Sequence, residues 1–394
     1  MKNSPLFVLF ITIFIDLLGF GLIIPILPTY SAELGAPSWV IGLIAASFSM
    51  MQFIFSPFWG GLSDRYGRKP IIIGSVSITT IAYIIFAFTN HFAYPFGLII
   101  LTVSRIFSGI GSANLSAAQA YISDVTLPEN RAKSFGIIGA AFGLGFIFGP
   151  PIGGFLKMNY GIESVGFVAA LLCFLNVIVA FFFLPESIKE KNKNATVFSN
   201  PLKDLKEITK MPVVSILGLS NFIFITAFSM MQITAALLWE EHYGLNEAKI
   251  GYVFMYIGLT TAIIQGTLIG KFNKWFGEKQ LMIYGCILVF IGLFTLPLVP
   301  VQYFVPLEML SITFISLGNA FLMPTITSLI SKKVPQNQQG KMLGLNQSLG
   351  SLGRVIGPII GGAVYGINYH LPYFLGASFL LFVLWLVLYK LGKL

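Results

Sequence analysis

The sequence consists of long apolar runs separated by short polar turns, and this pattern predicts its secondary structure. A bilayer core about 30 Å thick needs roughly 20 apolar residues per helix, and such runs recur along the whole chain. They predict twelve membrane-spanning helices, with both termini on one side. The predicted helices cover about residues 6–29, 39–60, 71–89, 97–119, 133–156, 164–184, 212–238, 249–270, 280–299, 304–329, 342–366 and 372–390. The predicted fold class is an all-α integral membrane protein.

Composition supports the membrane assignment. Of the 394 residues, 56% are hydrophobic and 10% are charged, against about 25% charged in soluble domains. An ordinary soluble protein is therefore excluded. Cys173 and Cys286 both fall within predicted helices, so the sequence predicts neither a disulfide framework nor a metal site.

Lys and Arg are sorted between the two faces of the predicted helix array. Because the positive-inside rule counts basic residues in short loops, this sorting predicts the topology. One face has only Lys157 and Lys249. The other carries Lys2, Arg65, Arg68, Lys69, Arg131, Lys133, the linker lysines from Lys189 to Lys210, Lys271, Lys274, Lys279, Lys332, Lys333, Lys341, Lys390 and Lys393. We therefore expect cytoplasmic termini in the cytoplasmic (inner) membrane, and no nucleic-acid partner despite the net charge of +9.

A hydrophilic linker divides the chain into two halves. It covers residues 188–210 and separates predicted six-helix bundles at 1–187 and 211–394. An internal repeat with an offset of 208 supports the division, and two loop glycines recur as well. The repeated positions are Gly145, Gly149, Pro150, Gly153 and Gly154 with Gly353, Gly357, Pro358, Gly361 and Gly362, and Gly60 and Gly67 with Gly270 and Gly277. Such a duplication predicts two bundles related by pseudo-twofold symmetry, with a substrate site between them.

The loop after the second predicted helix reads Gly60-Gly-Leu-Ser-Asp64-Arg65-Tyr-Gly67-Arg68-Lys69. It resembles the signature between helices 2 and 3 of the major facilitator superfamily. That resemblance implies the major facilitator fold and a cytoplasmic gate in which the aspartate contacts arginines and the start of helix 11. The gate residues would be Gly60, Asp64, Arg65, Gly67, Arg68, Asp124 and Arg131. The alternative is that these charges only anchor the topology. The second copy has Lys274 in place of Asp64, which predicts an asymmetric gate.

The fifth predicted helix carries a glycine and proline series at Gly145, Gly149, Pro150, Gly153 and Gly154. Small residues let helices approach closely, and proline permits bending, so the series alone is consistent with ordinary packing. Its spacing resembles the antiporter motif of the superfamily. The resemblance implies export rather than uptake.

Two ionisable residues lie deep in the predicted first bundle. Asp16 lies about 15 Å from the cytoplasmic end of the first helix, where burial favours the protonated form and a neighbouring Arg105 would favour the charged form. The first helix resembles tetracycline efflux proteins and their multidrug relatives, whose first-helix aspartate serves transport. Arg105 in the fourth helix is similar to the buried-arginine motif of proton-coupled members. The alternatives are a polar contact between helices for Asp16 and a hydrogen-bonding structural role for Arg105.

The chain departs from the tetracycline proteins at two places. The third helix has no acidic residue in Thr80-Ile-Ala-Tyr83, and Arg354 adds a second intramembrane cation in the eleventh helix. An arginine there must face the bundle interior, because exposure to lipid is costly. Arg354 would bind an anionic or zwitterionic substrate, have a structural role, or pair with Glu308.

The sequence therefore predicts a proton-coupled secondary active antiporter that exports a small amphipathic compound by alternating access. We expect a monomer in the lipid bilayer that needs no cofactor beyond the proton gradient. Polar side chains expected to line the cavity are Gln52, Asn114, Gln119, Asn221, Gln232, Gln265, Asn319 and Asn346. The alternative within the fold is a symporter or facilitator for a sugar or organic acid. A membrane enzyme would need a nucleophile and base or a metal cluster, and an ATP-driven pump would need a phosphate loop; the sequence has neither pattern.

Overall fold

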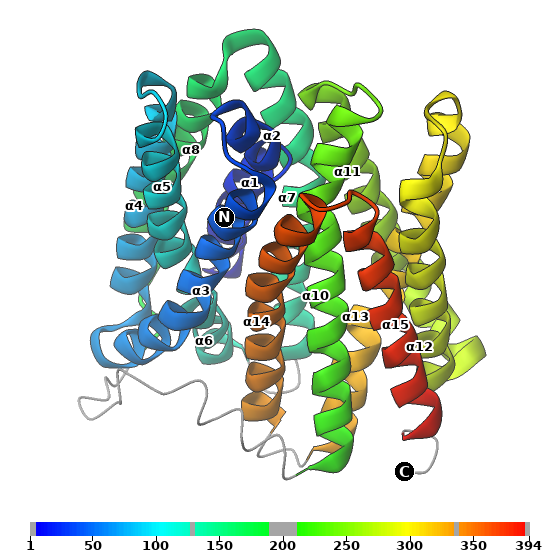
Figure 1. Cartoon of the computed structure of the whole chain (residues 1–394). Helices are drawn as coiled ribbons and strands as arrows, with labels where there is room; N and C mark the ends of the chain where they lie inside the picture. Colours follow the sequence, from blue (N-terminus) through cyan, green and yellow to red (C-terminus); the bar gives the residue numbers. More distant parts are fainter. Residues whose placement is uncertain (1–4, 127–130, 189–210, 335–338, 391–394) are drawn as a thin grey trace. The chain divides into compact units, whose positions relative to one another are not determined.

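A computed structural model of the chain describes residues 5–126, 131–188, 211–334 and 339–390, and that part is helical without strands (Figure 1). The first half of the sequence forms α1 Pro5–Ile23, α2 Ile26–Glu33, α3 Ser38–Tyr66, α4 Arg68–Ala87, α5 Phe96–Gly111, α6 Leu115–Val125, α7 Arg131–Tyr160 and α8 Ile162–Phe183. The second half forms α10 Pro212–Glu241, α11 Glu247–Ile263, α12 Ile269–Thr295, α13 Met309–Lys333, α14 Gln339–Tyr365 and α15 Leu371–Tyr389. The predicted linker, 188–210, lies almost wholly outside the described residues.

The predicted twelve spans are confirmed, although several are broken within the membrane-length segment. α1 and α2 form one span interrupted before Pro25, and α5 and α6 form one span joined by a 3-10 turn at Ser112–Asn114. A π-helical turn at Ile264–Leu268 links α11 to α12, which changes direction at Gly277. By length and hydropathy alone, ten of the described helices are long and apolar enough to cross a membrane. α11, which has only 17 residues before the π turn, and α14, which is rich in glycine and polar residues, are not among them.

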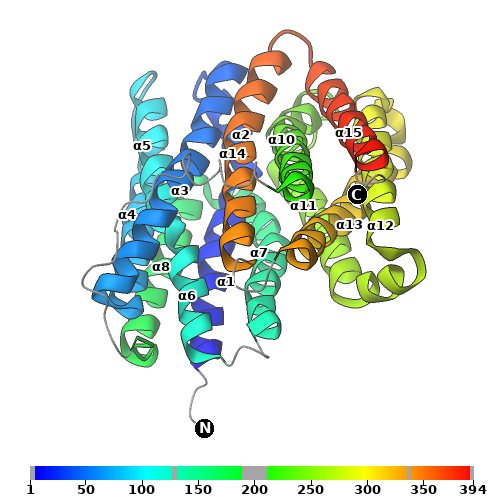
Figure 2. The ribbon, with the colours of Figure 1, turned by 90° about the horizontal axis from the view of Figure 1, so that it is seen from below.

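The described helices fall into two compact units. One unit comprises Met1–Ala36, Ser47–Ser199 and Asn246–Met255, and the other comprises Pro37–Ala46, Asn200–Leu245 and Tyr256–Leu394. In the first unit α1 packs along α7, and α4 packs against α5 and α8. In the second unit α10 packs along α14, and α12 packs against α13 and α15 (Figure 2). The two packing schemes correspond helix by helix, as expected for the predicted pseudo-twofold repeat.

Repeated glycines explain why the two packing schemes match. A Cβ added at Gly149 or Gly153 of α7 would collide with the backbone of α1. A Cβ added at Gly357 of α14, the repeat equivalent of Gly149, would collide in the same way with the backbone of α10. The sequence repeat therefore preserves these two close helix contacts, since only glycine leaves room for the neighbouring backbone.

A second pair of repeated glycines forms the tight turns after α3 and within α12. Gly67 has φ +115° and Gly277 has φ +76°, values that disfavour residues with a Cβ. Each glycine directly precedes a helix that begins with a charged residue, Arg68 in the first copy and Glu278 in the second. The turns therefore place these two charges at equivalent positions in their units.

Each unit also contains a short segment from the other half of the sequence. The start of α3, Pro37–Ala46, belongs to the second unit, where Gly42 and Gly362 bring α3 close to α14. The start of α11 belongs to the first unit, where Gly154 and Gly251 bring α11 close to α7. The boundaries of the two units therefore differ from the single division at the linker that the hydrophobic pattern predicts.

Candidate transport site and cytoplasmic gates

Asp16 lies at the centre of a buried polar network in the first unit. Its side chain is 7% exposed, and its Oδ2 accepts a hydrogen bond of 2.9 Å from the Nδ2 of Asn114. The same amide donates to the Oγ of Ser75 at 2.9 Å, which joins α1, α4 and the turn before α6. The other carboxyl oxygen of Asp16 has no hydrogen-bond partner in the described part of the chain. An ionised carboxylate is poorly stabilised there, whereas a protonated one is neutral, so the site is suited to bind and release a proton.

Arg105 is also buried, but it is not paired with Asp16. Its guanidinium lies 5.3 Å from the ring centre of Phe86 and 5.8 Å from that of Tyr83, a cation–π arrangement. The remaining contact is a long hydrogen bond of 3.5 Å from Nε to the Oγ of Ser104, and Nη2 has no partner within the described residues. The sequence suggested that Arg105 lies beside Asp16, but the two side chains do not form an ion pair in this conformation.

Tyr83 is a site residue that the sequence reasoning missed. Its buried side chain lies close enough to both Asp16 and Arg105 to interact with their charges. The available signal was the stripe of Ser75, Thr79 and Tyr83, which recurs every four residues and places three hydroxyl groups on one face of α4. None of these three residues is acidic, so the absence of an acidic residue from this helix gave no indication of the stripe.

Arg354 in the second unit has no acidic partner in the described part of the chain. Its side chain is half-buried, and its Nη2 donates a hydrogen bond of 3.0 Å to the Oγ of Ser351, one turn earlier in α14. The suggested pairing with Glu308 is not made, because Glu308 accepts a hydrogen bond from Trp239 instead. Arg354 therefore keeps most of its five donors available for another acceptor.

The loop after α3 forms an ion-pair cluster with Arg68 at its centre. Arg68 contacts Asp64 at 2.5 Å and Asp124 at 3.0 Å, and donates to the Oγ of Ser63 at 2.7 Å. Arg68 thus joins Asp64 and Asp124, three of the residues named for the gate. Arg65 is exposed, with its guanidinium over its neighbour Tyr66. A Cβ added at Gly60 would be in ordinary van der Waals contact with Ser116, while the side chain of Arg131 lies outside the described residues.

Glu186 completes this cluster and was not predicted as a site residue. Its carboxylate accepts hydrogen bonds from the backbone N–H groups of Arg68, at 3.0 Å, and Lys69, at 3.2 Å. These groups are the unsatisfied donors at the start of α4, where a negative charge is favourable. The end of α8 is thereby joined to the gate loop.

The second copy of the loop contains an ion pair of opposite polarity. Glu278, which follows Gly277 as Arg68 follows Gly67, binds Lys332 at 2.7 Å and accepts a hydrogen bond of 2.5 Å from the Oγ of Ser328. Lys332 corresponds to Asp124 at the repeat offset of 208. The two loops therefore differ in the signs of their charges, but the turn and the ion pair are arranged in the same way. Lys274, which suggested the asymmetry, is exposed.

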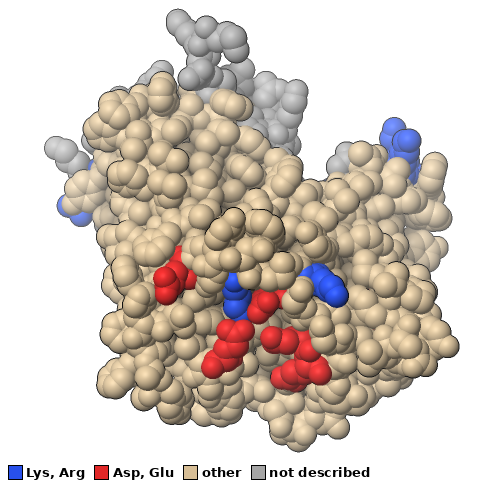
Figure 3. Space-filling model, turned by 90° about the horizontal axis from the view of Figure 1, so that it is seen from above, with Lys and Arg blue, Asp and Glu red and all other residues tan. Residues whose placement is uncertain are grey.

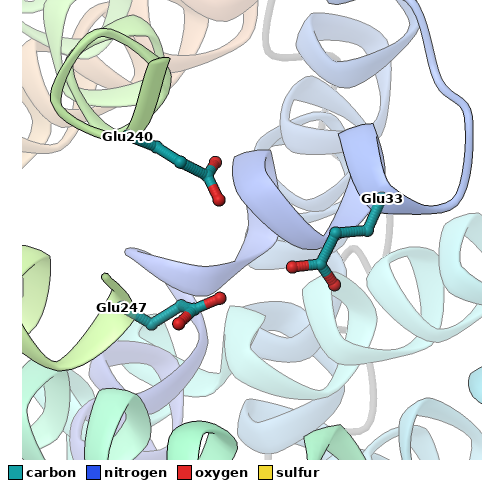
Figure 4. A group of neighbouring side chains, drawn as sticks. All are labelled: Glu33, Glu240 and Glu247. Atoms are coloured by element: carbon teal, nitrogen blue, oxygen red, sulfur yellow. The ribbon is translucent and has the colours of Figure 1, made fainter. Parts of the chain in front are cut away.

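An ion-pair cluster also forms at the opposite end of the first unit. Lys157, near the end of α7, binds Glu33 of α2 at 2.6 Å and Glu247 of α11 at 2.7 Å. The carboxylates of these two glutamates extend from their separate helices in Figure 4. Burial would raise the pKa of Glu247, but the hydrogen bond and charge of Lys157 outweigh it and hold the pKa below its usual value. Lys157 thereby ties α2 and α7 to the start of α11.

The polar side chains proposed to line a cavity all lie away from the fully exposed surface. Asn114, Asn221 and Asn346 are buried, and the other five are half-buried, namely Gln52, Gln119, Gln232, Gln265 and Asn319. Asn221 donates to the backbone carbonyl of Asn346 at 3.1 Å, and the side-chain oxygen of Asn346 has no partner in the described part. These positions are compatible with a polar interior, although some of the groups serve contacts between helices.

Comparisons with known proteins place these features in a family context. A family model described as "Major Facilitator Superfamily" matches residues 9–358 and 276–393. "Multidrug resistance protein 2" of Bacillus subtilis (strain 168) is 31% identical over 97% of this chain and 94% of the relative. "Tetracycline resistance protein, class C" of Escherichia coli is 31% identical over 92% of this chain and 90% of the relative. The crystal structure of the human organic anion transporter MFSD10 (TETRAN) aligns with a TM-score of 0.73 at 24% identity, covering 98% of this chain and 99% of that one.

Proposed function

Because the chain belongs to the Major Facilitator Superfamily and is a multi-pass membrane transporter rather than an enzyme, we propose that it is a proton-coupled antiporter. The exported substrate is a small amphipathic compound, and the proton gradient is the only energy source required. The observation that carries the proposal is Asp16, a buried carboxyl group with one oxygen bound to Asn114 and the other without a partner in the described part. The names of the multidrug and tetracycline resistance relatives support export.

In this mechanism Asp16 holds a proton while its surroundings are closed to water. Entry of water, or approach of a cation, stabilises the carboxylate and releases the proton. Arg105 can supply that cation, because its Nη2 lacks a partner within the described residues and its contacts with Phe86 and Tyr83 are weaker than an ion pair. Movement of Arg105 between the rings and Asp16 would therefore couple a conformational change to proton release.

Arg354 is an argument for a substrate that carries a hydrogen-bond acceptor group. A half-buried guanidinium that donates to a neutral hydroxyl retains further donors for a carboxylate, phosphate or enolate oxygen. The substrate class that fits best is thus an amphipathic compound that carries an anionic or zwitterionic group. Arg354→Gln should weaken transport of such compounds more than transport of cationic ones, whereas a structural role would reduce all transport and the melting temperature together.

The proposed orientation places both termini in the cytoplasm of a cell whose cytoplasmic membrane holds the protein. The gate clusters of Arg68 and Glu278 would then lie on the cytoplasmic side, and Lys157 on the outer side. Figure 3 shows one end of the molecule, and its scattered charged side chains include more acidic than basic ones. The positive-inside rule counts the basic side chains alone, and an outer face is expected to carry few of them. A monomer is sufficient, because each proposed site lies within one chain.

Purified protein in lipid vesicles tests the proposed function directly. A pH gradient should drive uptake of an amphipathic probe such as tetracycline in exchange for protons, and Asp16→Asn should abolish the driven flux without lowering the melting temperature. Undiminished driven flux in Asp16→Asn would remove Asp16 from the mechanism. Flux of probe and protons in the same direction would favour the alternative, a metabolite symporter, and flux that ignores the pH gradient would favour a facilitator.

A further inference from the structure

Glu308 is a second buried acidic residue, and neither the proton site nor the gates use it. It lies in the second unit, at the end of a π-helical turn at Phe304–Glu308, where α13 begins. The side chain is 0% exposed. α13 then runs 25 residues, about 37 Å, to the Lys332 end, so Glu308 lies far from the second gate cluster.

The contacts of Glu308 favour the protonated form of its carboxyl group. Oε1 accepts a hydrogen bond of 2.7 Å from the indole Nε1 of Trp239, which is itself fully buried in α10. Oε2 has no hydrogen-bond partner, and no basic side chain forms an ion pair with Glu308, within the described residues. A buried carboxylate with a single neutral donor is costly, whereas the protonated group is neutral and gains a donor of its own.

The surrounding titratable groups do not supply a positive charge. Tyr243, after α10, and Tyr373, on α15, are near enough to interact electrostatically with Glu308. The hydroxyl of Tyr243 donates to the carbonyl of Val299 at 2.8 Å, so it is already engaged. The hydroxyl of Tyr373 is buried without a hydrogen-bond partner in the described part of the chain. The two tyrosines are therefore neutral at ordinary pH, and the nearest further charge in the described part, the Glu241 carboxylate that interacts with Tyr373, is negative.

From this geometry we infer that Glu308 is a second proton-binding site, which holds a proton in this conformation and exchanges it when water reaches the contact with Trp239. The inference rests on the proposed proton coupling only for the use of that proton in transport. Separation of the start of α13 from α10 would expose Oε1 and Oε2 together and allow ionisation. The two units would then each contain one proton-carrying carboxyl group, Asp16 in the first and Glu308 in the second.

Infrared difference spectra of the full-length protein in lipid nanodiscs, recorded between acidic and alkaline pH, test this site without any transported compound. The C=O stretch of a protonated carboxyl group should titrate in the wild-type protein, persist in Asp16→Asn and lose one component in Glu308→Gln. Trp239→Phe should keep that component but shift its frequency, because the indole hydrogen bond is lost. Identical carboxyl bands in wild type and a folded Glu308→Gln would overturn the inference.

Two further outcomes separate this inference from the proposed function. If Glu308→Gln does not fold, Trp239→Phe alone decides, and an unshifted band would again contradict a proton on Glu308. If Asp16→Asn retains full driven flux in vesicles while the Glu308 component still titrates, the proposed role of Asp16 fails but the second proton site stands. The expected result is that all variants fold and that the Glu308 component titrates in every one of them except Glu308→Gln.

Discussion

At the scale of single residues, Asn114 should set the pH at which Asp16 releases its proton. Its amide donates to the carboxylate, and a hydrogen bond to a charged group is worth about 1.5 to 3 kcal/mol. Asn114→Leu removes this stabilisation of the ionised form, so proton release needs a higher pH. We expect the pH of half-maximal transport to rise by about one unit or more. Probe flux in vesicles, measured across a pH series, gives this value.

Asn176→Leu is the matched control for that change. Asn176 is another buried amide in the same unit, and it donates to the backbone carbonyl of Thr12 in α1 at 3.1 Å rather than to Asp16. Its substitution should lower the melting temperature and leave the pH profile in place. A wild-type pH profile in Asn114→Leu would mean that the amide only holds α1 and α4 together.

The sequence predicts which residues are unusual better than it predicts their partners. Asp16 and Arg105 stand out because charged residues are rare in membrane helices, and both are buried as expected. Their partners depend on the rotation of helices far apart in sequence, and in the structure Arg105 lies against the rings of Phe86 and Tyr83. Ser75 and Tyr83 carry no charge, so the hydrophobic pattern gives little reason to choose them over other polar residues.

At the scale of helices and loops, the two gate clusters have equivalent geometry. We nevertheless expect them to contribute unequally to the stability of the protein. Arg68 is nearly buried, but Asp64 is 46% exposed and Asp124 25% exposed, so water screens the carboxylates that Arg68→Ala leaves behind and the stability should fall by about 1.5 to 3 kcal/mol. Lys332 is 64% exposed, so Lys332→Ala should cost about 1 kcal/mol or less. Thermal unfolding of the purified variants measures both effects.

Reversing the second ion pair tests whether the two gates are equivalent. Glu278→Arg alone places like charges together and should destabilise the protein. The double variant Glu278→Arg with Lys332→Asp has the polarity of the first copy and should regain the wild-type melting temperature. Lys274→Asp is the control, because this exposed lysine has no role in the cluster. Failure of the double variant to recover would mean that Ser328 or the backbone requires the carboxylate of Glu278.

The repeat made the correspondence between halves predictable, but not the breaks within the helices. Offsets between glycines identify Gly67 with Gly277, and both have positive φ. The 3-10 turn at Ser112–Asn114 and the π turn at Ile264–Leu268 interrupt runs that remain apolar, so hydropathy does not detect them. The first of these breaks carries Asn114 to Asp16, and it therefore bears directly on the site.

At the scale of the whole molecule, the hydrophobic pattern predicts the helices and their number but not which segments associate. The start of α11, Asn246–Met255, joins the first unit because Gly154 and Gly251 allow close contact with α7. An equivalent exchange brings Pro37–Ala46 into the second unit through Gly42 and Gly362. Close packing of this kind depends on three-dimensional shape, and the apolar faces involved look alike in sequence.

Lys157 reinforces the first of these exchanged contacts with charge. Its side chain is 9% exposed, and it forms ion pairs with the carboxylates of both Glu33 and Glu247. The pKa of Glu247 is lowered from its ordinary value of 4.5. The ion pair with Lys157 therefore stabilises the folded protein fully above pH 4.5, and this stabilisation is lost as the pH falls through the lowered pKa of the folded protein. The contact between α7 and α11 should therefore be unchanged from neutral pH down to about 4.5 in the wild-type protein.

Spin labels at Tyr160 of α7 and Tyr252 of α11, both exposed, make this contact measurable. Lys157→Met should lengthen the distance between the labels at neutral pH, because Glu33 and Glu247 then repel each other without a cation between them. Acidification should shorten it again in the variant, since protonation removes that repulsion. Lys249→Met, which removes the other basic residue of this face, should leave the distance unchanged. A wild-type distance in Lys157→Met at neutral pH would show that the glycine contacts alone hold α11 against α7, and that the ion pairs add no measurable stability to the closed arrangement.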